Sequence, residues 1–356
     1  MHQSGVTDSS KLSFGLTGSQ EAFGERSRAP VFVMGCHRSG TNLLYDMLLS
    51  AGGFAVYRGY LPIYKMLIPK FGALDSESNR RRILDTWLRS KGFRRSGLEA
   101  SQLRTKIVQG CRTGGDFIRI IMEEIAQAQN VKRWAVYDPD NVLYVPQIKR
   151  EISNALFVHI IRDGRDVAFS LKKMGGYRPL PWGGSRGLRA TTLYWEWMVQ
   201  KGRQYGRSIP LDYIEVRYED LMLKPHTTLQ SLGEFLAHDL NYDRIRSRAL
   251  GRLTESNSSF LDEAQESSVP PMDRWKQRLT RTQVAGMEAL VGDTLQQSGY
   301  ALTTRAASSR SAIRHHMLRA FYRNFLEAKL WLKLNTPMGR LANLSALELS
   351  DASQGR

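Results

Sequence analysis

A glycine-bounded loop with the sequence GCHRSGTN occupies Gly35–Asn42, directly after the apolar run Val31–Met34. Its two glycines have four residues between them, as in the loop with which P-loop nucleotide hydrolases hold phosphate through backbone N–H groups and a helix N-terminus. Those enzymes then need Lys followed by Ser or Thr, whereas this chain has Thr41 and Asn42 there and carries its cation at Arg38. The loop therefore predicts an anion site without the ATP-hydrolysing arrangement. The alternative is a glycine-rich turn that binds nothing.

A second pair of residues, Arg162 and Ser170, follows the apolar run Ala155–Ile161. Arg162 stands where this expected strand ends, and Ser170 comes about two turns into the next helix. Open α/β sheets bind ligands at the edge where parallel strands end, so a cation and a hydroxyl in these places can hold one phosphate group. The segment RDGRD from 162 to 166 could instead be a cluster of surface salt bridges. Together with the glycine loop, it favours two phosphate sites at one sheet edge.

Short apolar runs alternate with helix-like segments along the chain. We expect strands at Val31–Met34, Trp134–Tyr137, Ala155–Ile161 and Ile214–Val216. The third strand should be central, because nearly all its residues are apolar. We expect helices from Thr41 to Gly52 and within Arg80–Leu88, Phe117–Ala128, Val142–Ile152, Val167–Lys172 and Thr191–Gln200. The alternation predicts an α/β fold with a P-loop-type central parallel β-sheet flanked by helices.

Three regions differ in composition. Residues 1–29 are polar and lack an apolar stretch, so we expect a flexible N-terminal arm. Residues 30–303 hold the alternating segments and form a single domain. Residues 304–356 begin with apolar residues four apart from Ile313 onward, interleaved with Arg and Lys, which predicts a basic amphipathic helix followed by a tail. This helix packs on its own domain or in a homodimer, or it docks on an anionic membrane surface.

Charge and cysteine content limit the partners and the compartment. The net charge of +17 suits an anionic cofactor, an acidic acceptor, a membrane surface or nucleic acid. No zinc-finger spacing or RNA-binding aromatic signature accompanies the charge, so nucleic acid is not expected. Cys36 and Cys111, the only cysteines, make neither a disulfide framework nor a zinc site. No run approaches the roughly 18 apolar residues of a membrane span, so we expect a soluble, cytoplasmic protein that can be peripheral at the membrane.

The two phosphate motifs, with VRYEDL at Val216–Leu221 and DRWKQRL at Asp273–Leu279, resemble those of the sulfotransferase superfamily. The resemblance runs from about Pro30 to Tyr300 and is greatest to the branch of bacterial and Golgi tyrosylprotein and glycan sulfotransferases. GCHRSGTN is similar to the family's 5′-phosphosulfate loop, and HIIRDGRDVAFS to its 3′-phosphate strand and helix. The resemblance implies 3′-phosphoadenosine 5′-phosphosulfate (PAPS) as donor, PAP as product and no metal. It places the donor on Gly35, Cys36, His37, Arg38, Ser39, Gly40, Thr41, Asn42, Arg162, Ser170, Tyr218, Trp275 and Lys276.

The resemblance also implies in-line transfer of a sulfuryl group to a hydroxyl or amine, in which positioning and charge neutralisation dominate. Arg38 would neutralise the transferring group, and a general base should take the acceptor's proton. For this base the chain departs from the family pattern. No Glu stands at the family's distance after the loop, and Tyr137 occupies the place of an expected Lys. Asp138 is then the first candidate base, with a helix N-cap as its alternative role, and His37 is the second.

Two other functions remain open. A P-loop kinase-like transferase would need a loop Lys and a magnesium-binding acid. A catalytically silent PAPS- or glycan-binding protein would need neither the missing Glu nor the missing Lys. The acceptor, a glycan, a lipid or another small molecule, has no readable motif. Gly175–Gly187, rich in Gly, Pro and aromatics, predicts a mobile loop in which Tyr177 and Trp182 could cover it. His159, within the central strand, is expected to be a structural core residue.

Overall fold

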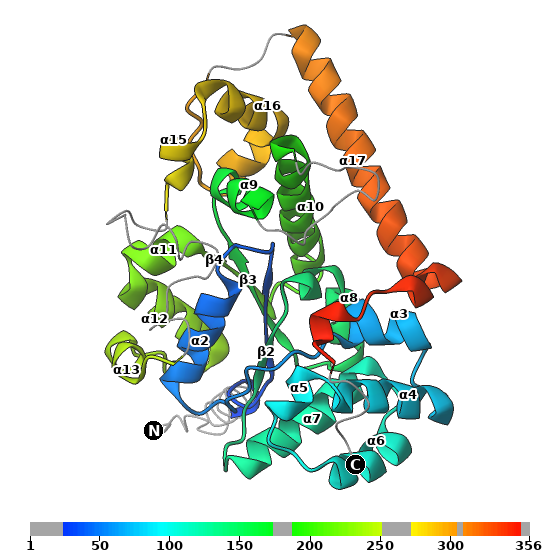
Figure 1. Cartoon of the computed structure of the whole chain (residues 1–356). Helices are drawn as coiled ribbons and strands as arrows, with labels where there is room; N and C mark the ends of the chain where they lie inside the picture. The colour runs from blue at the N-terminus through cyan, green and yellow to red at the C-terminus, as the bar shows by residue number, and fades with distance from the viewer. Residues whose placement is uncertain (1–23, 174–186, 251–271, 305–308, 350–356) are drawn as a thin grey trace, which may run out of the picture.

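Four parallel strands form the centre of the protein (Figure 1). The computed structural model describes residues 24–173, 187–250, 272–304 and 309–349. The strands are β1 (Val31–Gly35), β2 (Ala135–Tyr137), β3 (Leu156–Ile161) and β4 (Tyr213–Arg217), in the order β2-β1-β3-β4. Val31 pairs with Ala135 on one side and with Leu156 on the other, and Ile161 pairs with Arg217. The predicted α/β fold with a parallel sheet is confirmed, and β3 is an interior strand.

Helices connect these strands and flank the sheet. They are α2 (Thr41–Ala51), α3 (Ile68–Phe71), α4 (Glu77–Leu88), α5 (Lys91–Arg94), α6 (Ala100–Gly110), α7 (Gly114–Ala128), α8 (Val145–Glu151), α9 (Gly164–Lys173), α10 (Leu188–Gly206), α11 (Tyr218–Leu223), α12 (Pro225–Leu236), α13 (Tyr242–Arg248), α15 (Arg274–Arg278), α16 (Arg281–Gln297) and α17 (Ser309–Asn335). A π-helix, η1, spans Ile63–Leu67, and 3₁₀ turns span Pro139–Leu143 (η2), Pro337–Leu341 (η5) and Ser345–Leu347 (η6). The single helix expected over Val142–Ile152 is therefore two pieces, η2 and α8.

The sheet separates two hydrophobic cores, because successive side chains of a strand point to opposite faces. Val31 and Val33 of β1 face one core with α2, α12 and α13, which lie together on one side of the sheet in Figure 1. Phe32 and Met34 face the other core, built with α7, α8, α9 and α10. All five residues of β1 are buried. The strand that carries the glycine loop is thus held rigidly from both sides.

Residues 24–29, expected to belong to a flexible arm, are packed against the domain. Arg133 donates hydrogen bonds to the Ala29 carbonyl at 2.8 Å and to the Arg26 carbonyl at 3.1 Å. The Arg26 guanidinium in turn reaches the carbonyl of Leu211 at 2.8 Å. These bonds anchor the chain just before β1. The rest of the arm, like Tyr177 and Trp182, lies outside the described residues.

The C-terminal helix α17 runs along the outside of the domain beside α10 and α16 (Figure 1). Leu326 is buried against the body. Arg319 pairs with Glu196 of α10 at 2.6 Å, and Glu327 accepts from Trp197 and Lys201 at 2.8 Å each. One face of the helix therefore belongs to the domain itself. Among the described residues, none of the helices is both long and apolar enough to cross a bilayer.

Candidate active site

The glycine loop joins β1 to α2 in two left-handed steps. Arg38 has φ 74° and Gly40 has φ 99°, a region that suits glycine and turns the chain into the helix. A Cβ on Gly40 would lie 2.5 Å from a ring carbon of Tyr218, so only glycine fits this approach. The first backbone N–H groups of α2 have no partners within the helix and carry its positive dipole end. The local geometry is therefore of the kind that binds an anion, and the anion site stays a prediction.

An unsatisfied hydroxyl within the loop tests whether an anion fits. Ser39 is only 1% exposed, and its Oγ has no hydrogen-bond partner among the described residues. Buried hydroxyls in folded proteins are nearly always paired, and an orphan implies a missing partner. A phosphate or sulfonate oxygen against the loop supplies that partner. The residues present therefore fit the donor that the sequence resemblance implies.

The two predicted phosphate motifs meet at the carboxyl ends of β1 and β3. Arg38 Nε donates to Ser170 Oγ at 2.9 Å, and Arg162 Nη1 donates to the Arg38 carbonyl at 3.3 Å. The Arg162 guanidinium also lies 4.6 Å from the centre of the Tyr218 ring. Residues more than 120 positions apart in the chain are thus in direct contact. The glycine loop and the β3–α9 turn form one cationic site.

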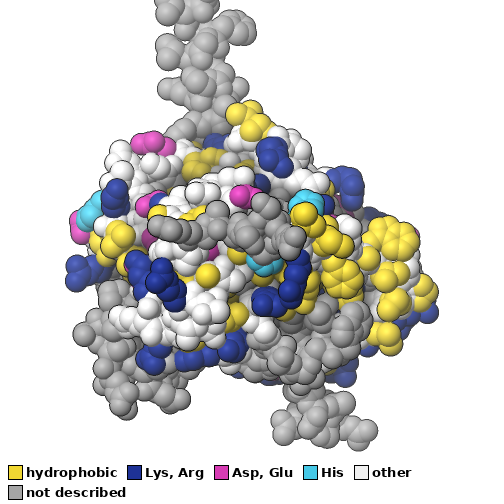
Figure 2. Space-filling view, turned by 90° about the horizontal axis from the view of Figure 1, so that it is seen from above, with side chains coloured by type: hydrophobic (Ala, Val, Ile, Leu, Met, Phe, Trp, Pro, Cys, Tyr) yellow, Lys and Arg dark blue, Asp and Glu magenta, His cyan; other side chains and the backbone are white. Residues whose placement is uncertain are grey.

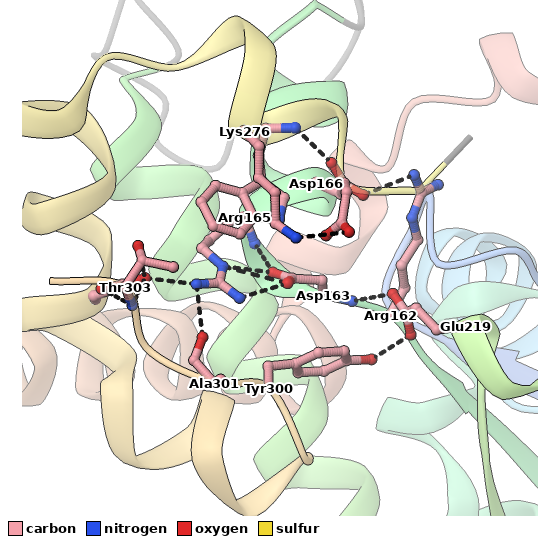
Figure 3. A network of polar contacts seen from close by, with 12 residues as sticks. Arg162, Asp163, Arg165, Asp166, Glu219, Lys276, Tyr300, Ala301 and Thr303 are labelled. Atoms are coloured by element: carbon pink, nitrogen blue, oxygen red, sulfur yellow. Dashed lines mark hydrogen bonds and ion pairs between the residues drawn. The ribbon is translucent and has the colours of Figure 1, made fainter. Parts of the chain in front are cut away.

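The RDGRD segment is a buried ion network rather than a surface salt-bridge cluster (Figure 3). Arg165 pairs with Asp163 at 2.7 Å and with Glu288 of α16 at 2.5 Å. Arg162 pairs with Asp166 at 3.3 Å. Because buried charges must be paired, each of these contacts fixes the turn that presents Arg162. The network ties the phosphate edge to α16.

The two remaining segments that resemble the family, Val216–Leu221 and Asp273–Leu279, contact the β3–α9 turn from outside. The backbone N–H of Trp275 donates to Asp166 at 2.9 Å, and its ring lies 3.8 Å from the Arg165 guanidinium. Glu219 accepts from the Asp163 N–H at 3.0 Å and from the Tyr300 hydroxyl at 2.7 Å, as Figure 3 shows. The segment around Trp275 is a short helix, α15, rather than a loop.

Of the residues predicted to bind PAPS, Lys276 has the least support from the geometry. Its side chain is exposed, and its ammonium group pairs with Asp273 at 2.8 Å on the solvent side of α15. The remaining predicted positions of the loop, from Gly35 and Cys36 to Thr41 and Asn42, form the turn and the first residues of α2. The Cys36 thiol is fully buried, which raises its pKa well above the ordinary value and keeps it neutral.

A cluster of ionisable groups lies beyond the end of β2, next to the loop. Asp140 forms an ion pair with Lys65 of η1, and its Oδ2 lies 3.3 Å from His37 Nε2. The Tyr194 hydroxyl donates to Asp140 Oδ1 at 3.4 Å. Asp138 caps η2 by accepting from the Asp140 N–H at 3.0 Å. Both candidate bases, His37 and Asp138, therefore lie at one junction, and Asp138 also serves as the N-cap that was its alternative role.

Burial and mutual attraction set the charges in this cluster. Burial opposes ionisation of Asp140, but Lys65 and His37 hold its pKa well below the usual range. Burial alone lowers the pKa of Lys65, yet Asp140 and Asp138 outweigh it and raise the pKa above its ordinary value. Asp138 has its pKa raised, first by burial and then by Asp140, against the opposing effect of Lys65. Asp140 is thus a fixed carboxylate opposite a fixed ammonium group.

A model of the sulfotransferase family matches residues 30–243, which is more than half of the chain and contains both phosphate motifs. The chain belongs to the sulfotransferase family. The sequence resemblance is therefore confirmed at the level of the family.

Individual relatives are distant. The chain is 26% identical over 222 residues to a Caenorhabditis briggsae protein named "Putative protein-tyrosine sulfotransferase". This match covers 60% of the chain and 66% of that protein, so the chain spans slightly less than two thirds of the relative's length. Similar solved structures include the sulfotransferase domain of the Synechococcus PCC 7002 olefin synthase, with a TM-score of 0.47 and 16% identity over 82% of this chain and 94% of that one. Mouse sulfotransferase SULT7A1 complexed with PAP has a TM-score of 0.42 and 13% identity over 79% of this chain and 91% of that one.

Two positions at which this chain departs from its family pattern have structural roles. Arg58, which stands near the expected Glu, lies 3.4 Å from Asp46. Tyr137, in place of the expected Lys, packs its ring 4.6 Å from that of Tyr45. His159 is fully buried and hydrogen-bonds the Tyr213 hydroxyl at 2.6 Å, as expected of a core residue.

Three charged residues in or near this cluster were not predicted from the sequence: Lys65, Asp140 and Lys333. Lys65 lies on a π-helix, a conformation found often at functional sites, but the local sequence IYKML gives no sign of it. Asp140 is two residues after the predicted Asp138, so the Asp-Pro-Asp spelling was the available signal. Lys333 comes from α17. Burial lowers the pKa of Lys333, against the opposing effect of Asp140.

Proposed function

We propose that this chain transfers a sulfuryl group from PAPS to a hydroxyl or amine of an acceptor. The observation that carries the proposal is the junction of Arg38, Ser170 and Arg162, where two anion-binding motifs from separate strands share hydrogen bonds. A loop that holds a single phosphate group needs no second cation from a neighbouring strand. A site for a donor with phosphate groups at both its 5′ and 3′ ends does need this second cation. Thr41 and Asn42 in place of the Lys-Ser/Thr pair disfavour the kinase-like alternative.

Bound PAPS supplies an activated sulfonate whose leaving group is a phosphate oxygen. The protein's part is to hold and neutralise the charge. The loop amides, the Ser39 hydroxyl and the N-terminus of α2 bind the 5′ end, and Arg162 with Ser170 binds the 3′-phosphate. Arg38 lies between these groups and neutralises negative charge as it moves onto the leaving oxygen.

His37 is the base that the geometry favours. With Nε2–H donating to Asp140, the imidazole keeps its lone pair on Nδ1, where it can accept the acceptor's proton. His37 is also the neighbour of Arg38, so the base and the neutralising cation share one loop. Asp140 orients the imidazole and does not titrate near neutral pH, because its pKa is held low. Asp138 remains the second candidate.

Donor binding is the first test. We expect PAP to raise the melting temperature of the protein and ATP with magnesium to leave it almost unchanged. Arg162→Ala should abolish the PAP shift. The matched control is Arg81→Ala, which removes an exposed arginine that pairs with Glu77 on its own helix. A larger shift with ATP than with PAP would refute the proposed donor.

Transfer is the second test. Sulfur-labelled PAPS is incubated with a panel of phenols, hydroxylated lipids, glycans and tyrosine peptides, and labelled products are separated by chromatography. We expect Arg38→Ala to lower the transfer rate by roughly 10²-fold or more, as for other groups that stabilise developing negative charge. Arg81→Ala should retain the full rate. PAP binding without transfer to any acceptor would instead support the silent binding protein.

A further inference from the structure

The outer face of α17 is apolar although nothing in the described structure covers it. Ile313, Met317, Phe321 and Trp331 are all exposed, Phe321 by 57% and Trp331 by 59% of their surface. At about 100° per residue these four side chains project within about 80° of one another. Leu334 borders this arc, and Met338 and Leu341 of η5, which packs against α17, are exposed as well. We name these seven residues the outer α17 face.

The outer α17 face is not the side by which the helix packs on the domain. Leu318, Tyr322 and Leu326 lie on the opposite side and contact the hydrophobic core. Figure 2 shows hydrophobic side chains gathered on the side of the molecule where α17 lies in Figure 1, with Lys and Arg side chains around them. The helix therefore has two apolar faces, of which the domain uses one. Single exposed apolar residues need no explanation, but four large ones within one arc of a helix do, although exposed Asn324 and Ala328 share that arc.

Cations border this face, and acids do not. Exposed Arg314 and Arg323 flank it on its two sides, and exposed Arg340 follows in η5. The single acidic residue of α17, Glu327, turns inward and pairs with Lys201 and Trp197. A row of Phe, Trp, Ile and Met between arginines is the pattern of a helix that lies in the plane of a membrane interface. The net charge of +17 adds long-range attraction to an anionic surface.

A second copy of the chain fits this face less well. In a symmetric dimer the same patch would meet itself, so Arg314 and Arg323 of both copies would come together. The described part of α17 has no exposed acid to pair with them. Anionic lipid headgroups complement these arginines, and the interfacial region of a bilayer suits Trp331.

We propose that the outer α17 face docks the protein on an anionic lipid bilayer, with its apolar side chains inserted at the headgroup level and its arginines on the phosphates. The helix lies along the surface and does not span it. The inference is independent of the proposed sulfotransfer, because it rests on exposed residues that make no contact with the phosphate site.

Vesicle flotation with the full chain tests the proposal. We expect binding to vesicles of phosphatidylcholine with phosphatidylserine at low salt, and much weaker binding to phosphatidylcholine alone. The double variant Phe321→Ser/Trp331→Ser should lower the partition coefficient roughly tenfold or more, from the lost apolar insertion. Arg314→Gln/Arg323→Gln should lower it by about fivefold per arginine on the anionic vesicles only.

A matched control removes as much exposed apolar surface elsewhere. Leu211 and Leu223 are 81% and 67% exposed, and α11, which carries Leu223, lies across the molecule from α17 in Figure 1. The variant Leu211→Ser/Leu223→Ser should bind vesicles like the wild type. Unchanged melting temperatures and PAP shifts confirm that all variants fold.

Three results would overturn the proposal. The first is equal binding to neutral and anionic vesicles, or no binding to either. The second is vesicle binding that Phe321→Ser/Trp331→Ser leaves intact. The third is a dimer by light scattering that the same double variant converts into a monomer, which would assign the face to a second copy of the chain.

Discussion

Replacing Asp140 with Asn separates the proposed base from the group that orients it. The Asp140 carboxylate is 7% exposed and serves both Lys65 and His37 through Oδ2. Asparagine keeps the shape of the side chain and loses its charge. The change therefore tests whether this carboxylate acts on the reaction through His37.

The expected size of the effect follows from these contacts. A positioned general base contributes about 10²- to 10⁴-fold in rate. The Asn oxygen can still accept one hydrogen bond, so we expect the lower half of that range, a fall in kcat of about 10²- to 10³-fold, or about 3–4 kcal/mol. Losing one partner of a buried ion pair costs about 3–5 kcal/mol of stability. Lys65 is 28% exposed and can turn to water, so a loss near the lower end is expected.

The assay compares turnover with donor binding. Transfer from labelled PAPS to the best acceptor of the panel gives kcat, and calorimetry with PAP gives the dissociation constant. PAP affinity should change by less than about threefold, since Asp140 binds no part of the phosphate junction. His37→Gln should lower kcat at least as much as Asp140→Asn does, because it removes the base itself. The double variant should be no slower than His37→Gln alone, because Asp140 acts only through that base.

Independent effects would refute this reasoning. If the losses of the two single variants multiply in the double variant, Asp140 does not act through His37. If Asp140→Asn keeps more than half of the wild-type kcat while remaining folded, the pair has no catalytic role. Asp138 would then be the candidate to test.

Three further predictions concern the loop, the buried network and the core. Gly40→Ala should weaken PAP binding about tenfold by calorimetry, because the added Cβ meets the Tyr218 ring at a left-handed φ. Arg165→Met should lower the free energy of unfolding in urea by about 3–5 kcal/mol, because it leaves two buried carboxylates without their cation; the exposed control Arg81→Met should cost less than about 1 kcal/mol. Burial lowers the pKa of His159 to about 4, so the unfolded chain binds a proton first and the free energy of unfolding should fall by about 3 kcal/mol between pH 6.5 and 4. His159→Gln should lack this fall.

The parts of the fold that depend on local pattern could be predicted from the sequence. The apolar runs before the glycine loop and before RDGRD correspond to β1 and β3, within one residue at their ends. Buried parallel strands are apolar on both faces, so their runs are continuous and easily recognised. The glycine loop was equally readable, because Gly40 combines a left-handed φ with a close approach to Tyr218 that only glycine allows, and because a loop of this kind binds anions through its backbone.

The acid-base cluster could not be predicted, because it depends on contacts between distant segments. Counting along the chain from Arg38 leads to Arg58, whereas the residue that reaches the site is Lys65, on a π-helix farther on. Lys333 arrives from α17, far away in sequence. A charged residue in a helix usually faces solvent, so nothing in the sequence marks these two lysines as partners of carboxylates. The tertiary packing of η1 against η2 is what brings Lys65 to Asp140.

The Arg38–Ser170 hydrogen bond changes how the two phosphate motifs are understood. The sequence resemblance assigns Arg38 to the transferring sulfonate and Ser170 to the 3′-phosphate, as separate sites. In the structure the two side chains bind each other, and Arg162 binds the backbone of the same loop. Ser170 accepts from Arg38 and keeps its own O–H, which can donate to a phosphate oxygen at the same time. One hydroxyl can therefore hold the cation of the loop and a phosphate group of the donor together, so the two motifs work as a single site in which the loss of Ser170 would disturb both.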